Sequence, residues 1–330
     1  MRILLLLAIL ASSCAHTDRN NERYLEAKNS SNVQREEESG GEDSTEQMRY
    51  RKACDGGDMN GCSNLGLLES KKGNLARARF LYNQACGGGA MIGCSNLGDL
   101  EYAKGKLVEA GQLYKQACAG KEMNGCYNLG VLEAQNGNLA KAALLYKQAC
   151  AGGEMNGCSN LGILKENEGK RVEARMLQKK ACDGGNLTGC YNLGTLKYKE
   201  GKISESRLLD IKACDGGVML GCFALGVLAN NNGNLAEAGL FYKKACDGGV
   251  INGCSSLGFL ETNKGNLAEA ELFFKKSCNG GVALGEMISC FMLGLMKRDE
   301  GNFADARHFF NRACDGGYND ACQALVNLAP

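Results

Sequence analysis

The chain has 330 residues, with 38 basic and 37 acidic side chains, 44% apolar residues and no Trp. This near-neutral balance gives no electrostatic footprint for nucleic acid, so no nucleic-acid partner is expected. The two histidines, His16 and His308, leave little material for histidine-based metal or acid–base chemistry.

The N-terminus has the pattern of an export signal. Arg2 precedes an apolar run over residues 3–10, which has the length of a signal-peptide core and is too short to span a bilayer. We therefore predict a signal peptide at residues 1–13. The sequence Leu-Ala-Ser-Ser-Cys, ending at Cys14, resembles a bacterial lipobox, whose Cys is lipidated. Small residues before a cleavage site also suit ordinary signal peptidase, so two outcomes stay open: a lipoprotein of the periplasm or outer membrane, and a secreted protein.

A polar and acidic segment follows at residues 14–45. It contains the run Glu36, Glu37, Glu38 and has no apolar periodicity. Such a composition cannot bury enough apolar surface to fold, so the segment is predicted to be a disordered tether. Contact with a membrane is expected only through a lipid on Cys14.

Residues 46–330 are built on a 32-residue period that the cysteines mark. Eighteen of the nineteen cysteines form nine pairs, and eight pairs have the spacing Cys-x7-Cys. The pairs are Cys54 and Cys62, Cys86 and Cys94, Cys118 and Cys126, Cys150 and Cys158, Cys182 and Cys190, Cys214 and Cys222, Cys246 and Cys254, Cys278 and Cys290, and Cys314 and Cys322. A fixed period of this length is typical of stacked repeats, in which each unit buries its apolar face against its neighbours. We therefore predict one elongated repeat domain.

Each period contains two predicted helices, which we call A and B. In the third repeat, apolar residues at intervals of three and four mark helix A at Leu129 and Leu132, and helix B at Leu139 and Ala142. A glycine such as Gly137 lies between them and can adopt the left-handed conformation that ends a helix.

An Asn after this glycine is predicted to cap helix B by accepting from its free amides. The residues concerned are Asn74, Asn138, Asn234, Asn266 and Asn302. A half-unit at residues 46–54 begins the array and a closing helix at residues 318–329 ends it. With eight complete A–B units between them, the sequence predicts eighteen short helices.

Two known families share this pattern. The array resembles the tetratricopeptide repeat at Leu65-Gly66, Tyr82 and Ala85. The signature Ala-Cys-x7-Cys-x-x-Leu-Gly, seen at residues 117–130, is similar to the disulfide-rich Sel-like repeats of the Helicobacter cysteine-rich protein family. The resemblance extends from about residue 50 to the end. It implies an all-α fold, a right-handed superhelical α/α solenoid of about eight to nine repeats that serves as a binding scaffold.

The paired cysteines have two explanations. Structural zinc sites favour closely spaced ligands with a second such pair nearby, which the x7 spacing does not supply. An exported chain meets an oxidising compartment, and a helix-turn-helix junction can bring two α-carbons within bonding range. We therefore predict a disulfide within each pair and no metal. Each disulfide contributes roughly 2.5 kcal/mol on the chain-entropy model.

The candidate binding residues lie on helix A, directly before the Leu-Gly pair. In five successive repeats this residue is Asn, at Asn64, Asn96, Asn128, Asn160 and Asn192. The tetratricopeptide resemblance implies that these residues face a concave groove, where an amide can both donate to and accept from a peptide backbone. The alternative is that Asn-Leu-Gly belongs to the repeat consensus and satisfies nearby helix ends.

The preceding position becomes more aromatic toward the C-terminus, with Tyr127, Tyr191 and Phe223. Aromatic side chains commonly anchor interfaces, so these residues are candidates for partner specificity, with packing between repeats as the alternative. The four extra residues between Cys278 and Cys290 either present a bulge to a partner or reflect drift in a tolerant loop.

The sequence contains no Ser-x-x-Lys, Lys-Thr-Gly, His-Glu-x-x-His, Gly-x-Ser-x-Gly or Walker-type motif. We expect no catalytic residues and no cofactor. The predicted function is an exported, monomeric scaffold that binds a peptide or protein partner. Some members of the cysteine-rich family are catalogued as β-lactamases, so the resemblance implies a penicillin-binding protein or weak β-lactamase as the alternative.

Overall fold

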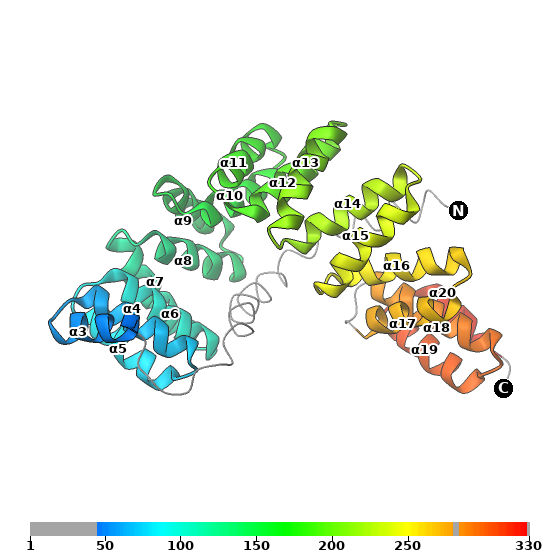
Figure 1. Cartoon of the computed structure of the whole chain (residues 1–330), viewed down its shortest axis with the longest axis horizontal. Helices are drawn as coiled ribbons and strands as arrows, with labels where there is room; N and C mark the ends of the chain where they lie inside the picture. The colour runs from blue at the N-terminus through cyan, green and yellow to red at the C-terminus, as the bar shows by residue number, and fades with distance from the viewer. Residues whose placement is uncertain (1–44, 280–283, 329–330) are drawn as a thin grey trace. The chain divides into compact units, whose positions relative to one another are not determined.

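The computed structural model describes residues 45–279 and 284–328, which form eighteen α-helices (Figure 1). The predicted signal peptide at residues 1–13, the proposed lipid site Cys14 and the tether up to residue 44 lie outside the described residues. Thr45, the last residue of the predicted tether, already begins the first helix. Among the described residues, no helix is both long and apolar enough to cross a membrane.

The helices follow the predicted order. A single helix, α3 (Thr45–Asp55), opens the array. The eight A–B pairs are α4 (Met59–Lys71) with α5 (Leu75–Gly87), α6 (Met91–Ala103) with α7 (Leu107–Ala119), α8 (Met123–Gln135) with α9 (Leu139–Ala151), α10 (Met155–Asn167) with α11 (Arg171–Asp183), α12 (Leu187–Lys199) with α13 (Ile203–Asp215), α14 (Met219–Asn231) with α15 (Leu235–Asp247), α16 (Ile251–Lys264) with α17 (Leu267–Cys278), and α18 (Leu284–Asp299) with α19 (Phe303–Asp315). The short helix α20 (Asn319–Val326) closes the array.

The described chain divides into two compact units, residues 45–189 and residues 190–328 without 280–283. Within the units, each helix from α3 to α11 and from α13 to α20 packs against the next one along the chain. The A helices also pack against one another, at α4 with α6, α6 with α8, and α16 with α18. Successive B helices in the described units do not pack against one another in this way. The A helices are therefore closer together than the B helices and lie on the inner side of each stack. These contacts confirm the predicted all-α solenoid of helix-turn-helix repeats.

The Leu-Gly pair of helix A lets helix B pack closely. A Cβ added to Gly98 of α6 would lie 2.6 Å from the ring of Tyr114 in α7, a distance that no real side chain tolerates. Tyr114 is buried as a result. The same glycine–aromatic contact recurs in six of the eight repeats, where the ring belongs to Tyr82, Tyr114, Tyr146, Tyr242, Phe274 or Phe310. The two exceptions have Gln178 in α11 and Asp210 in α13 at this position.

A second glycine, directly before the second cysteine of the pair, brings the preceding helix onto helix A at all but the last two junctions, where Ser289 and Ala321 replace it. A Cβ on Gly93 of α6 would lie 2.6 Å from the Cβ of Ala85 in α5. Because the backbones approach so closely here, the Cα atoms of Cys86 and Cys94 lie 4.6 Å apart and their sulfurs are bonded.

Eight of the nine predicted disulfides are formed within the described units. They join Cys54 and Cys62, Cys86 and Cys94, Cys118 and Cys126, Cys150 and Cys158, Cys214 and Cys222, Cys246 and Cys254, Cys278 and Cys290, and Cys314 and Cys322. Cys182 and Cys190 stand on either side of the division between the units, and their pairing stays a prediction.

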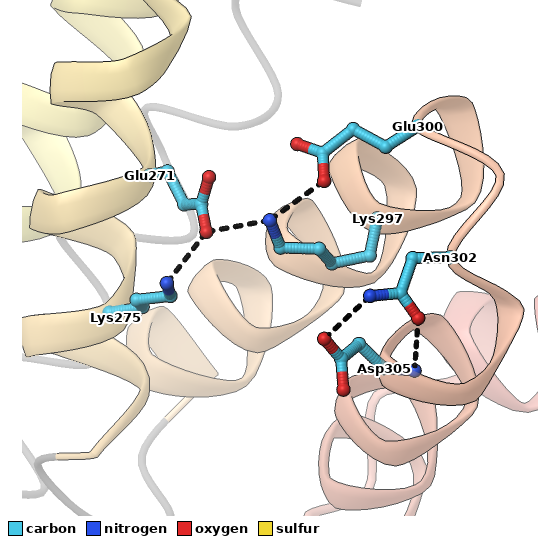
Figure 2. Close-up of polar contacts among 6 residues, drawn as sticks. All are labelled: Glu271, Lys275, Lys297, Glu300, Asn302 and Asp305. Carbon is cyan, nitrogen blue, oxygen red and sulfur yellow. Dashed lines mark hydrogen bonds and ion pairs between the residues drawn. The ribbon is translucent and has the colours of Figure 1, made fainter.

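The turn between helices A and B contains the expected left-handed glycine, for example Gly73 with φ of 80°. The predicted caps form in two repeats. The side-chain oxygen of Asn234 accepts from the backbone N–H of Glu237 at 3.3 Å. The oxygen of Asn302 accepts from the backbone N–H of Asp305 at 3.2 Å (Figure 2).

In the other three repeats the Asn stands at the N-cap position, but the predicted hydrogen bond from its side chain to helix B is not formed. There the Asn donates through Nδ2 to a glutamate at the end of helix A, in the pairs Asn74 with Glu69 at 2.9 Å, Asn138 with Glu133 at 2.9 Å, and Asn266 with Glu261 at 2.7 Å. The repeats with a cap have Ala229 or Lys297 at this glutamate position. Without a glutamate at the end of helix A, the Asn turns to helix B: its oxygen caps the helix and its Nδ2 donates to a carboxylate of the first turn, that of Glu237 at 2.9 Å or Asp305 at 2.8 Å.

Candidate ligand-binding face of the A helices

The five asparagines before the Leu-Gly pairs occupy equivalent positions on successive A helices. Asn64, Asn96, Asn128 and Asn160 lie on α4, α6, α8 and α10 of the first unit, and Asn192 lies on α12 in the second. All five side chains are half-buried. They are therefore neither core residues nor freely mobile surface residues.

Two of these asparagines are bound to the preceding A helix through their amide nitrogens. Asn96 Nδ2 donates to the hydroxyl of Ser63 at 3.2 Å. Asn128 Nδ2 donates to Asp99 Oδ1 at 2.8 Å, and the same oxygen accepts from the Tyr114 hydroxyl at 2.7 Å. These bonds link consecutive repeats and fix the orientation of each carboxamide. They use the donor side of the group and leave its oxygen as an acceptor.

A third asparagine, Asn160, contacts helix B of the preceding repeat. Burial raises the pKa of the Tyr146 hydroxyl to about 12, and a hydrogen bond from Asn160 acts in the opposite direction. Three successive asparagines thus contribute to the contacts between repeats. A structural role and a ligand-binding role are compatible, because the contacts of Asn96 and Asn128 between repeats use the amide nitrogen and a ligand would use the oxygen.

The predicted specificity residues are half-buried and pack on the aromatic residues of helix B. The rings of Tyr127 and Tyr146 have centroids 6.0 Å apart, and those of Phe223 and Tyr242 are 5.8 Å apart. Tyr191 is half-buried on α12. Tyr127 and Phe223 therefore take part in packing, which was the alternative explanation for aromatic residues at this position. Each ring also keeps an exposed part.

The insertion before α18 is only partly described. Residues 280–283 lie outside the described residues, and Met287 of α18 is buried. The Cys278 and Cys290 disulfide forms despite the extra residues. Whether the insertion contacts a partner stays a prediction.

Sequence patterns did not reveal a polar contact between successive repeats of the second unit (Figure 2). Lys297 of α18 lies 2.7 Å from Glu271 of α17 and 2.8 Å from Glu300. Lys275 also pairs with Glu271, at 2.6 Å. Hydrogen bonds to Glu271 and Glu300 raise the pKa of Lys297, and hydrogen bonds from Lys275 and Lys297 lower the pKa of Glu271.

Sequence analysis also missed Asp210, a buried acid in α13. Its side chain is 2% exposed and faces Gly194 of α12, where other repeats place an aromatic ring. Ser206 donates to Oδ2 at 3.2 Å, but Oδ1 has no hydrogen-bond partner in the described structure. Burial raises the pKa of this carboxyl group to about 7. Aligning the repeats would have shown the residue, because it interrupts a column of Tyr and Phe.

No group of three potential metal ligands occurs in residues 45–279 or 284–328. What the described structure offers for binding is thus a row of carboxamides and half-exposed rings along the A helices.

No protein-family model matches the sequence, and no curated protein matches it. Solved structures with the same fold exist. The chain is similar to c5321, described as a protective antigen present in uropathogenic Escherichia coli strains displaying an SLR fold, with 21% identity and a TM-score of 0.59. The match covers 84% of this chain and 66% of that one, just under two thirds of its length.

Two further structures agree with this fold. A Sel1 repeat protein from Oxalobacter formigenes is 17% identical with a TM-score of 0.58, over 88% of this chain and 91% of that chain. Yeast Tom70 is 14% identical with a TM-score of 0.53, over 99% and 74% respectively. At these identities the likeness concerns the fold alone. It lends no support to the β-lactamase alternative, and the chain has the architecture of Sel1-like and tetratricopeptide-like repeat proteins.

Proposed function

We propose that the A-helix face of this repeat scaffold binds an extended peptide or an extended segment of a protein. The observation that carries the proposal is the orientation of the asparagine ladder. The amide nitrogens of Asn96 and Asn128 are held by the preceding repeat at 3.2 and 2.8 Å, which leaves their oxygens as fixed acceptors. Fixed acceptors spaced one per repeat suit the N–H groups of an extended backbone.

Such a row recognises the backbone and therefore tolerates many ligand sequences. Specificity would come from the half-exposed rings on the A helices of each unit, Tyr127 in the first and Tyr191 and Phe223 in the second, since aromatic residues commonly dominate binding energy at interfaces. Repeat arrays use their inner, extended surface for this purpose. The proposed scaffold works as a monomer and needs no cofactor.

The density of disulfides supports a location in an oxidising compartment, because cytosolic thiols are kept reduced. Together with the N-terminal sequence, it favours export, with Cys14 as the proposed lipid attachment site. Mass spectrometry of the mature protein tests this point. A diacylated Cys14 at the N-terminus is expected for a lipoprotein, and an unmodified N-terminus would indicate ordinary secretion.

The ladder is tested with peptides selected on the oxidised full-length protein from a random-sequence display library. Replacing Asn96, Asn128 and Asn160 with Ala should weaken the selected peptide about tenfold or more, since each lost hydrogen bond is worth on the order of 1 kcal/mol. Methylation of the peptide backbone nitrogens should weaken binding similarly. A matched control replaces Asn83 and Asn311, two exposed asparagines on B helices, and should leave affinity unchanged. Equal affinity for the triple variant and the wild type would remove the ladder from the binding model.

A further inference from the structure

A pocket of about 310 Å³ lies in the first unit between α5, α6 and α7. Its lining combines Leu97 and Leu113 with five polar side chains. Glu101 comes from α6, Arg79 from α5, and Glu109, Gln112 and Gln116 come from α7. The pocket is separate from the asparagine ladder, since none of the ladder residues lines it.

Glu101 is the buried group of this pocket, with 3% of its surface exposed. Arg79 Nε lies 2.7 Å from Oε1, and Lys106 Nζ lies 3.8 Å from Oε2. These cations balance its charge. Nevertheless, within the described structure neither carboxylate oxygen accepts a hydrogen bond of normal geometry. Burial of a carboxylate is costly, and ion pairs without well-aligned hydrogen bonds offset that cost only in part, so a ligand that supplies aligned N–H donors would gain free energy here.

Comparison with the other repeats shows that this arrangement is particular to one repeat. Glu69, Glu133 and Glu261 occupy the position of Glu101, and each accepts from the Asn that follows the turn glycine. In the repeat of Glu101 that Asn is replaced by Lys106. Glu101 therefore lacks the amide donor that Glu69, Glu133 and Glu261 have.

The pocket wall differs from the other repeats as well. Gln112 is a carboxamide, whereas six other repeats have an exposed apolar residue at this position of helix B. These residues are Phe80, Leu144, Met176, Leu208, Leu240 and Leu272. The pocket thus combines an unsatisfied carboxylate with further acceptors from Glu109, Gln112 and Gln116.

We propose that this pocket binds a guanidinium group, such as the side chain of an arginine in a ligand, with Glu101 as its carboxylate partner. A guanidinium presents two parallel N–H groups that match both oxygens of a carboxylate, and its other N–H groups can reach Glu109 and the glutamine oxygens. Arg79, whose side chain is 52% exposed, occupies the carboxylate in the absence of ligand. The ligand replaces Arg79, which can turn into solvent. This inference does not depend on the proposed peptide site.

The probe is N-acetyl-arginine amide, with the uncharged isostere N-acetyl-citrulline amide as the matched ligand. Binding to the oxidised full-length protein is followed by NMR shifts of the Gln112 and Gln116 side-chain amides. The arginine compound should bind at least about tenfold more tightly than the citrulline compound, because its hydrogen bonds to Glu101 are charge-assisted.

Three variants identify the site. Glu101→Gln should abolish the preference for arginine. Lys106→Asn, which restores the Gly-Asn turn of the other repeats at an exposed position, should weaken binding about tenfold by giving Glu101 an internal donor. Arg79→Ala should strengthen binding, because the internal competitor is gone. The proposal would be overturned if both compounds bound equally well. It would also be overturned if Lys106→Asn left the affinity for the arginine compound unchanged and Arg79→Ala weakened it. Lys106→Asn and Arg79→Ala keep the test informative if the buried Glu101→Gln variant fails to fold.

Discussion

Glu271 and Lys297 form the same contact between repeats as Arg79 and Glu101, with the charges exchanged. Glu271 and Arg79 occupy one position on helix B, and Lys297 and Glu101 occupy one position on the next helix A. The N–O distance is 2.7 Å in both pairs. At these two junctions the side chains carry opposite charges, and the ion pair forms with either order of the charges.

A double-mutant cycle tests the energetic coupling of Glu271 and Lys297. Because their side chains are only 17% and 12% exposed, we expect a coupling energy of about 1 kcal/mol between Glu271→Gln and Lys297→Met, measured by urea unfolding of the oxidised protein. The control is Lys243 and Asp247, an exposed pair within one helix, which should give about 0.3 kcal/mol or less. Equal coupling in both cycles would show that burial adds nothing to the Glu271 and Lys297 contact.

Asn74 and Asn234 follow equivalent turn glycines, but replacement with Asp should destabilise the protein only at Asn74. Asn234→Asp keeps the oxygen that caps α15 and adds a negative charge that favours a helix N-terminus, which offsets the loss of the solvent-exposed Nδ2 bond to Glu237. Its free energy of unfolding should therefore stay within about 0.5 kcal/mol of the wild type. Asn74→Asp removes the donor to Glu69 and places two carboxylates together, which should cost about 1 kcal/mol or more at pH 7.

Denaturation of both asparagine variants at pH 7 and at pH 3 checks the cause. The loss in Asn74→Asp should shrink at pH 3, where both carboxylates are protonated in the unfolded chain. A loss of the same size in both variants would show that the contact of Asn74 with Glu69 does not distinguish the two turns.

Asp210 should make the stability of its repeat depend on pH. Its pKa rises from 3.8 to about 7 on folding, so the folded state retains a proton that the unfolded state has already released. The contribution of protonated Asp210 to the free energy of unfolding is therefore fully present below about pH 4 and is lost as the pH rises to 7. This loss is at most roughly 4 kcal/mol.

The expected result is that Asp210→Asn stabilises the protein relative to the wild type by an amount that grows between pH 4 and pH 7 and is constant above. Asp210→Tyr, which introduces the residue that the following repeat has at this position, Tyr242, should stabilise it at neutral pH as well. Urea unfolding at several pH values measures both. A difference that does not change with pH would show that Asp210 is ionised in the fold at all of them.

The local disulfides should account for a measurable share of the stability. Replacing Cys118 and Cys126 together with Ala removes a short closed loop and should lower the free energy of unfolding by roughly 2.5 kcal/mol on the chain-entropy model. A peptide map of the unreduced protein should show nine local pairs, including Cys182 with Cys190. Free thiols or linkages between distant repeats would contradict the local pairing.

Much of the fold was predictable because it rests on local and periodic signals. The turn glycines, the apolar spacing and the Cys-x7-Cys period predicted the helix order, and the structure confirms eighteen helices in the described residues. Helix caps were predicted less well. A turn Asn has two possible partners, the free amides of helix B and the carboxylate at the end of helix A, and the sequence of the turn alone does not show which partner wins.

By itself the sequence determined the repeat, its two helices and the positions that recur in every unit, because a residue's place in a 32-residue period fixes the helix and the face on which it lies. Only the tertiary structure decided how particular side chains are used. It turned the amide nitrogens of Asn96 and Asn128 toward the preceding repeat. These outcomes depend on side chains about one period apart that meet only when repeats stack, and their distances and hydrogen-bond geometry are properties of the stack.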